Sequence, residues 1–139
     1  MRALQLVADG PDRVRAQASW TTPLRPNARV FATPLLWEGR VWVVQESGDL
    51  TVLDASSGAL VATAHLPQGT PGGFYGSPVA ADGRVWFGTQ SGDLVRARLS
   101  PAGGIELDVL PLEPMRSAPV FSGDALYVRT LAALWAFGP

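Results

Sequence analysis

The stretch GRVWVVQESGDL, residues 39–50, returns with few changes as GRVWFGTQSGDL at residues 83–94. A gap-free alignment of Pro34–Leu50 with Pro78–Leu94, at an offset of 44, gives nine identical residues in seventeen positions. Both copies are rich in β-branched and aromatic residues and are bounded by glycine, aspartate or serine, a pattern typical of strands joined by tight turns. The repeat therefore predicts a β-protein built from recurring units.

Two weaker copies flank this pair. APVFSGDALYVRTLAALWAF, residues 118–137, follows the second copy, and LQLVADGPDRVRAQASW, residues 4–20, resembles LTVLDASSGALVATAHL, residues 50–66. Equivalent leucines are spaced by 46, 44 and 40 residues, a spacing typical of four-stranded propeller blades. We therefore predict an all-β fold, a β-propeller of four-stranded antiparallel blades, with no helix longer than a turn or two. The expected units are residues 1–22 (partial), 30–66, 74–112 and 115–139, and the innermost strands begin near Pro34, Pro78 and Pro119.

The expected units amount to about three to four blades, whereas closed propellers typically have about four to eight. The prediction is therefore an incomplete arc, whose bare blade face and strand edges need the remaining blades or self-association. We favour the C-terminal part of a larger propeller, because the first strands look like a blade cut in the middle. The alternative is a half-propeller that closes by association.

Composition excludes several functional classes. The formal net charge is −1 and no run of like charges occurs, so nucleic acid and anionic membranes are not expected partners. The absence of cysteine excludes disulfides, thiolate metal sites and thiol nucleophiles. No stretch approaches the roughly 20 apolar residues of a membrane span. The apolar stretch in the opening MRALQLVADGPDR is too short for a signal peptide.

Catalytic, cofactor-binding and metal-binding residues are not predicted. The sequence has one asparagine, Asn27, and one histidine, His65. His65 has no partner at ligand or triad spacing and is interpreted as a structural or surface histidine. The recurring Trp42, Trp86 and Tyr127 are expected to pack between blades. The acids are interpreted as turn formers and solvated tips: Glu38, Glu46, Asp49, Asp82, Asp93 and Asp124.

The phrases SPVAADGRVWFGTQSGDL, LDASSGAL and SAPVFSGDALYVRTLAALWAFG resemble the PQQ-like (quinoprotein-type) β-propeller repeats. The resemblance covers roughly residues 28–138 and implies a propeller, with periplasmic or otherwise exported localisation. It does not imply one function, because the fold hosts dehydrogenases, an outer-membrane assembly lipoprotein and sensor domains of kinases. Ala62 stands where the family often has tryptophan, and RLSPAGG replaces the D-A-x-T-G segment in the third unit, which puts cofactor binding in doubt.

The resemblance also implies that the loops entering each innermost strand lie near the central axis, on the same face as the ESGD and QSGD turns. These loops, NARVFATP, GGFYGSP and PMRSAP, vary between copies while the surrounding framework repeats, which is typical of a binding surface. In the alternative interpretation, the side chains of Phe31 and Phe74 fill gaps in the hydrophobic core at the start of each blade and do not bind a partner. The candidate interaction face consists of Arg29, Phe31, Phe74, Tyr75, Met115 and Arg116.

Two functional classes follow. The first is a non-catalytic PQQ-like propeller module, a scaffold whose rigid face binds a protein or peptide and which needs no cofactor. The second is the C-terminal part of a propeller quinoprotein dehydrogenase or ligand-binding sensor whose active-site residues lie upstream. A dehydrogenase of this fold would need a carboxylate base and a calcium held by carboxylate and amide oxygens, and these residues do not cluster in the sequence.

Overall fold

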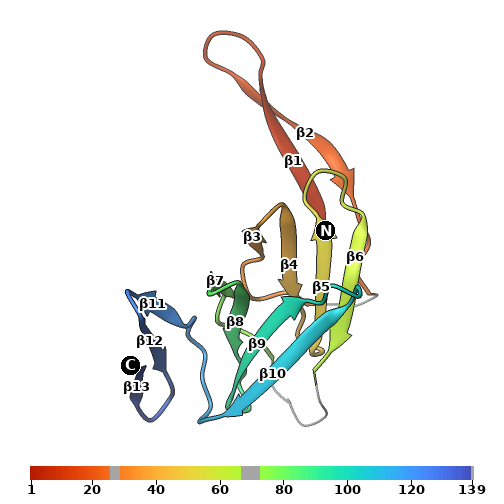
Figure 1. Ribbon diagram of the computed structural model, residues 1–139. Coiled ribbons are helices and arrows are strands. Elements are labelled where there is room, and N and C mark those ends of the chain that lie inside the picture. Colours follow the sequence, from red (N-terminus) through yellow and green to blue (C-terminus); the bar gives the residue numbers. More distant parts are fainter. Residues whose placement is uncertain (26–28, 67–72, 139) are drawn as a thin grey trace.

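The computed structural model describes residues 1–25, 29–66 and 73–138, which form thirteen strands in four antiparallel sheets (Figure 1). Sheet 1 consists of β1 (Arg2–Ala8) and β2 (Val14–Thr21). Sheet 2 consists of β3 (Leu35–Trp37), β4 (Arg40–Val44), β5 (Asp49–Asp54) and β6 (Leu60–His65). Sheet 3 consists of β7 (Val79–Ala81), β8 (Arg84–Gly88), β9 (Asp93–Leu99) and β10 (Ile105–Pro111). Sheet 4 consists of β11 (Val120–Ser122), β12 (Ala125–Arg129) and β13 (Leu134–Phe137).

The all-β prediction is confirmed: the described residues contain no helix, and sheets 2 and 3 are four-stranded with sequential strand order. The innermost strands β3, β7 and β11 each begin directly after the expected proline, which has no amide hydrogen to give to a ladder. Trp37 pairs with Arg40 across the two-residue turn Glu38–Gly39, whose φ angles of 47° and 68° are those of a type I′ hairpin.

Two apolar clusters hold successive sheets together. The first joins Trp42 and Leu50 of sheet 2 to Val85 and Phe87 of sheet 3. The second joins Leu94 and the half-buried Trp86 of sheet 3 to Leu126 and Val128 of sheet 4. The prediction that Trp42 and Trp86 pack at equivalent sites between blades is confirmed. At the same position in sheet 4, Tyr127 is 38% exposed, because no fifth sheet covers it within the described residues.

Sheet 1 is attached to the other sheets at its base. Trp20 donates a hydrogen bond from Nε1 to the carbonyl of Ala55 at 2.9 Å, and Thr22 donates one to the carbonyl of Gly58. From there the β1–β2 hairpin projects away from sheets 2–4, and sheet 4 lies at the other end of the arc (Figure 1). Leu4, Leu6 and Val14 are consequently exposed to the extent of 57%, 71% and 70%.

Candidate functional site

Three side chains at equivalent loop positions lie in a row across sheets 2–4. Phe31, Tyr75 and Arg116 each stand three residues before the proline that precedes an innermost strand. The rings of Phe31 and Tyr75 stack with centroids 5.3 Å apart and planes 19° apart. The Arg116 guanidinium lies 5.4 Å from the centroid of the Tyr75 ring, which is a cation–π geometry. We call these three residues the loop ladder.

The backbone beneath the loop ladder is tightly packed. Thr33 N donates a hydrogen bond to Ser77 Oγ at 3.1 Å, which links the first loop to the second. Gly76 lies so close to the third loop that a Cβ atom there would be 2.3 Å from the carbonyl oxygen of Ser117. The three loops therefore hold the ladder side chains on a fixed frame.

The ESGD and QSGD turns lie beside these loops, as the family resemblance implies. Glu46 N donates a hydrogen bond to the carbonyl of Arg29 at 2.8 Å, and Gln90 N donates one to the carbonyl of Gly73 at 3.3 Å. Arg29 Nε also lies 3.8 Å from Glu46 Oε2. Arg29 thus joins the rim of the ladder as a solvent-exposed, ion-paired side chain.

Two residues of the candidate face are not at the surface. Phe74 and Met115 are each only 1% exposed, so their side chains belong to the cores between sheets. Phe74 makes an edge-to-face contact with Phe87 at 5.9 Å, and Met115 occupies the space left by the missing side chain of Gly88. The reason is alternation, because adjacent residues in an extended loop point to opposite sides. The alternative role in the core is thus correct for Phe74, whereas Phe31, 49% exposed, lies at the surface.

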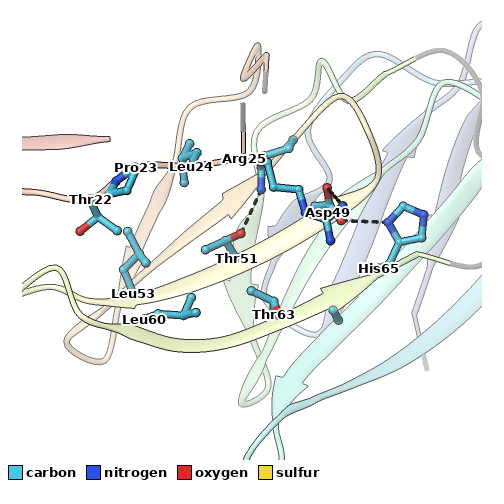
Figure 2. Close-up of a pocket in the computed structure, with 12 residues that line it drawn as sticks. Thr22, Pro23, Leu24, Arg25, Asp49, Thr51, Leu53, Leu60, Thr63 and His65 are labelled. Carbon is cyan, nitrogen blue, oxygen red and sulfur yellow. Dashed lines mark hydrogen bonds and ion pairs between the residues drawn. The ribbon is translucent and has the colours of Figure 1, made fainter. Parts of the chain in front are cut away.

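A second candidate site is a hollow of about 400 Å³ on the opposite face of sheet 2 from sheet 3 (Figure 2). Asp49 on β5 and His65 on β6 pair across the two strands, with Oδ1 of Asp49 and Nδ1 of His65 2.9 Å apart. Ser47 donates a hydrogen bond to Asp49 at 2.8 Å, and Arg25 Nη1 lies 3.4 Å from Asp49 Oδ2. Apolar walls complete the hollow, with contributions from Pro23, Leu24, Leu53 and Leu60.

His65 therefore has an acidic partner that the sequence spacing did not indicate, and Asp49 is a buried residue at the start of β5 and not a solvated tip. The 16 residues between them are spanned by the β5–β6 hairpin, whose register places the two side chains opposite each other. Burial by itself would raise the pKa of the Asp49 carboxyl, but the hydrogen bonds from His65 and Ser47 and the charge of Arg25 outweigh it. They hold the pKa below the ordinary value of 3.8.

The hollow is more polar than its counterpart in the next sheet. Thr51 and Thr63 line it, whereas the paired residues at the equivalent positions of sheet 3 are Val95 and Val109. Gln45 is 1% exposed and donates a hydrogen bond to Thr51, but its Oε1 atom has no partner. The repeats thus differ in polarity at this hollow, and only an alignment of the paired strands of each copy could have revealed this difference in the sequence.

The described residues contain no group of three or more histidine, aspartate or glutamate side chains placed to hold a metal ion. In the same part of the chain, no helix is long and apolar enough to cross a membrane.

The stacked antiparallel sheets define the class of fold, an incomplete β-propeller. Among solved structures the chain is similar to BamB from Moraxella catarrhalis, with a TM-score of 0.64 and 22% sequence identity. The match covers 88% of this chain and 40% of the BamB chain, so the chain spans less than half the length of this neighbour. At this identity the likeness shows the fold alone. No family model matches the sequence, and no curated protein matches it.

Proposed function

We propose that the chain is a PQQ-like β-propeller module that acts without catalysis and binds a protein or peptide through the loop ladder. The observation that carries the proposal is the contiguous row of Phe31, Tyr75 and Arg116 at equivalent positions of three successive units. The family-like phrases of the sequence and the structural likeness to BamB support the propeller fold on which the proposal rests.

The chemistry of the ladder suits protein recognition. Phe31 and Tyr75 are 49% and 42% exposed although both are large and aromatic, and aromatic and arginine side chains dominate binding energy at protein interfaces. The loops are held by backbone hydrogen bonds, so a partner meets a surface that is already ordered and the entropic cost of binding is reduced. Two guanidinium groups, Arg29 and Arg116, and one carboxylate, Glu46, surround the rings. We infer a partner segment that offers acidic and apolar side chains together.

The test is site-specific photo-cross-linking in cells of the organism whose genome encodes the protein. A benzophenone amino acid replaces Phe31 in one variant and Leu60 in the control, because Leu60 is 61% exposed but lies on the outer strand β6. We expect a discrete protein adduct at position 31 and not at position 60. Identical adducts at both positions, or none at position 31, would contradict the proposal.

The protein found at position 31 then serves as the probe in a binding titration. Tyr75→Ala and Arg116→Ala should each weaken its binding about tenfold or more, as expected for central interface residues. Leu60→Ala should leave the affinity unchanged. The same samples test the non-catalytic part of the proposal, because calcium-dependent dye reduction with added quinone and an alcohol or sugar would refute it.

A further inference from the structure

The last sheet has an open edge where the two complete sheets have a fourth strand. In sheets 2 and 3 the third strand pairs on its outer side with β6 or β10, whereas β13 pairs only with β12 among the described residues. The outer backbone groups of β13, Leu134–Phe137, are therefore free to pair with another strand.

A mainly apolar hollow of about 430 Å³, which the ion-paired Arg96 and Asp108 also line, lies beside this edge. Leu110 of β10 and Trp86 of β8 line one side of it, and Leu126 and Phe137 of sheet 4 line the other. Nearby, Val109, Leu110 and Trp135 remain 40%, 47% and 39% exposed. The space is large enough for two aliphatic side chains and has a mainly apolar wall.

The corresponding space between sheets 2 and 3 is filled by side chains of a fourth strand, which sheet 4 does not have among the described residues. There, Ile105 and Leu107 of the fourth strand β10 pack against the apolar cluster between the sheets. A fourth strand on sheet 4 would place its apolar residues in the hollow in the same way. The occupant must therefore be an extended strand with two large apolar residues spaced two apart.

The chain itself carries such a strand. In β1, Leu4 and Leu6 have this spacing and point to the same face as Val14 of β2. A two-stranded sheet with an exposed apolar face is only marginally stable by itself. The bulge of the hairpin lies in β2, where Ser19 is skipped in the pairing, so the free edge of β1 is regular. Because the hairpin and sheet 4 lie at opposite ends of the arc, β1 reaches β13 of another molecule and not its own (Figure 1).

We propose that β1 of a second copy of this chain adds antiparallel to the free edge of β13, with Leu4 and Leu6 in the hollow beside Leu110. Each copy then has one donor end and one acceptor end, so copies associate head to tail. This inference is independent of the loop ladder, which lies on the inner loops and not on the outer edge.

The experiment measures the mass of the full chain by light scattering over a concentration series. We expect the mass to rise above the 14.7 kDa of one chain. Leu6→Glu on the donor and Leu110→Glu on the acceptor should each weaken association at least tenfold, whereas Leu36→Glu should not. Leu36 is the matched control because it is 68% exposed on the innermost strand β3. Circular dichroism checks that each variant is folded.

Two further measurements distinguish the β1–β13 contact from any other contact between copies: mixing of the two glutamate variants, and hydrogen exchange of the backbone amides. The Leu6→Glu variant keeps its acceptor and the Leu110→Glu variant keeps its donor, so an equimolar mixture should form pairs that neither variant forms alone. Amide protection of residues 134–137 should rise with concentration in the unaltered chain and in Leu36→Glu, but not in Leu6→Glu or Leu110→Glu measured alone. A chain that stays monomeric at its highest soluble concentration, association insensitive to both glutamates, or a mixture that stays monomeric would overturn the proposal.

Discussion

Trp42 and Trp86, 44 residues apart in the sequence, occupy the same position in two successive sheets, and each packs against the sheet that follows it. Trp42 is 1% exposed, whereas Trp86 is half-buried, under the guanidinium of Arg96 at 5.5 Å. Trp42→Ala should therefore lower the free energy of unfolding by about 3–5 kcal/mol, and Trp86→Ala by less. Urea unfolding of both variants measures the difference, and the absence of a loss in either would show that the strand register is wrong.

Phe74 and Tyr75 are adjacent in one loop but belong to different environments. Phe74 is buried between sheets 2 and 3, and Tyr75 is 42% exposed in the loop ladder. Phe74→Ala should lower the free energy of unfolding by about 3–5 kcal/mol, because it opens a cavity. Tyr75→Ala should lower it by less than about 1 kcal/mol, as is usual for surface positions. A larger loss for Tyr75→Ala than for Phe74→Ala in thermal melts would contradict this assignment.

Gly76 is required by the close approach of two loops. A Cβ at this position would be 2.3 Å from the Ser117 carbonyl oxygen, and a backbone atom cannot move aside as a flexible side chain can. Gly76→Ala should destabilise the chain by about 1–3 kcal/mol, the usual cost of overpacking. Gly138→Ala is the control, because its nearest neighbour would be at an ordinary 3.7 Å. Equal melting temperatures for both variants would argue against the loop packing described above.

Gln45 stands where the other units have Thr89 and Thr130. Thr89 Oγ1 accepts hydrogen bonds from the backbone of Gly92 and Asp93, whereas Gln45 leaves its Oε1 atom buried without a partner. Gln45→Thr should therefore raise the free energy of unfolding by about 1 kcal/mol, because an unpaired buried polar atom is removed and the turn gains a cap. The reverse change, Thr89→Gln, should lower it. Both are measured by urea unfolding, and stabilisation by Thr89→Gln would refute the reasoning.

The Asp49 carboxylate gives the fold a dependence on pH. Its pKa in the folded chain lies below the ordinary 3.8, so the unfolded chain binds the proton more readily. The stabilisation from Asp49 is thus present above about pH 4 and is lost as the pH falls through the lower folded-state pKa. Asp49→Asn should cost about 1–2 kcal/mol at neutral pH and flatten the loss of stability in acid. Unfolding free energies measured from pH 3 to 7 check this, and parallel curves for the two proteins would contradict it.

The repeats allowed the sheets to be predicted from the sequence, because strand pairing here is local. Each sheet is a run of consecutive strands joined by short turns, so the turn glycines and the prolines before the innermost strands are sufficient signals. The positions of Trp42 and Trp86 between sheets follow from the same 44-residue offset. The expected binding loops also lie together, since equivalent positions of stacked units must lie side by side.

Other features depend on tertiary structure. The sequence alone could not separate Phe74 from Tyr75 or Met115 from Arg116, because alternation in an extended loop places one residue of each pair inside without showing which one, and only packing decides it. The contact between Asp49 and His65 depends on the register of one hairpin, which the spacing in the sequence does not reveal. Likewise, the direction in which the β1–β2 hairpin projects from the other sheets depends on tertiary structure. The sequence by itself determined the repeating strands, because their signals are local, and only the tertiary structure decided which side chains meet at the surface.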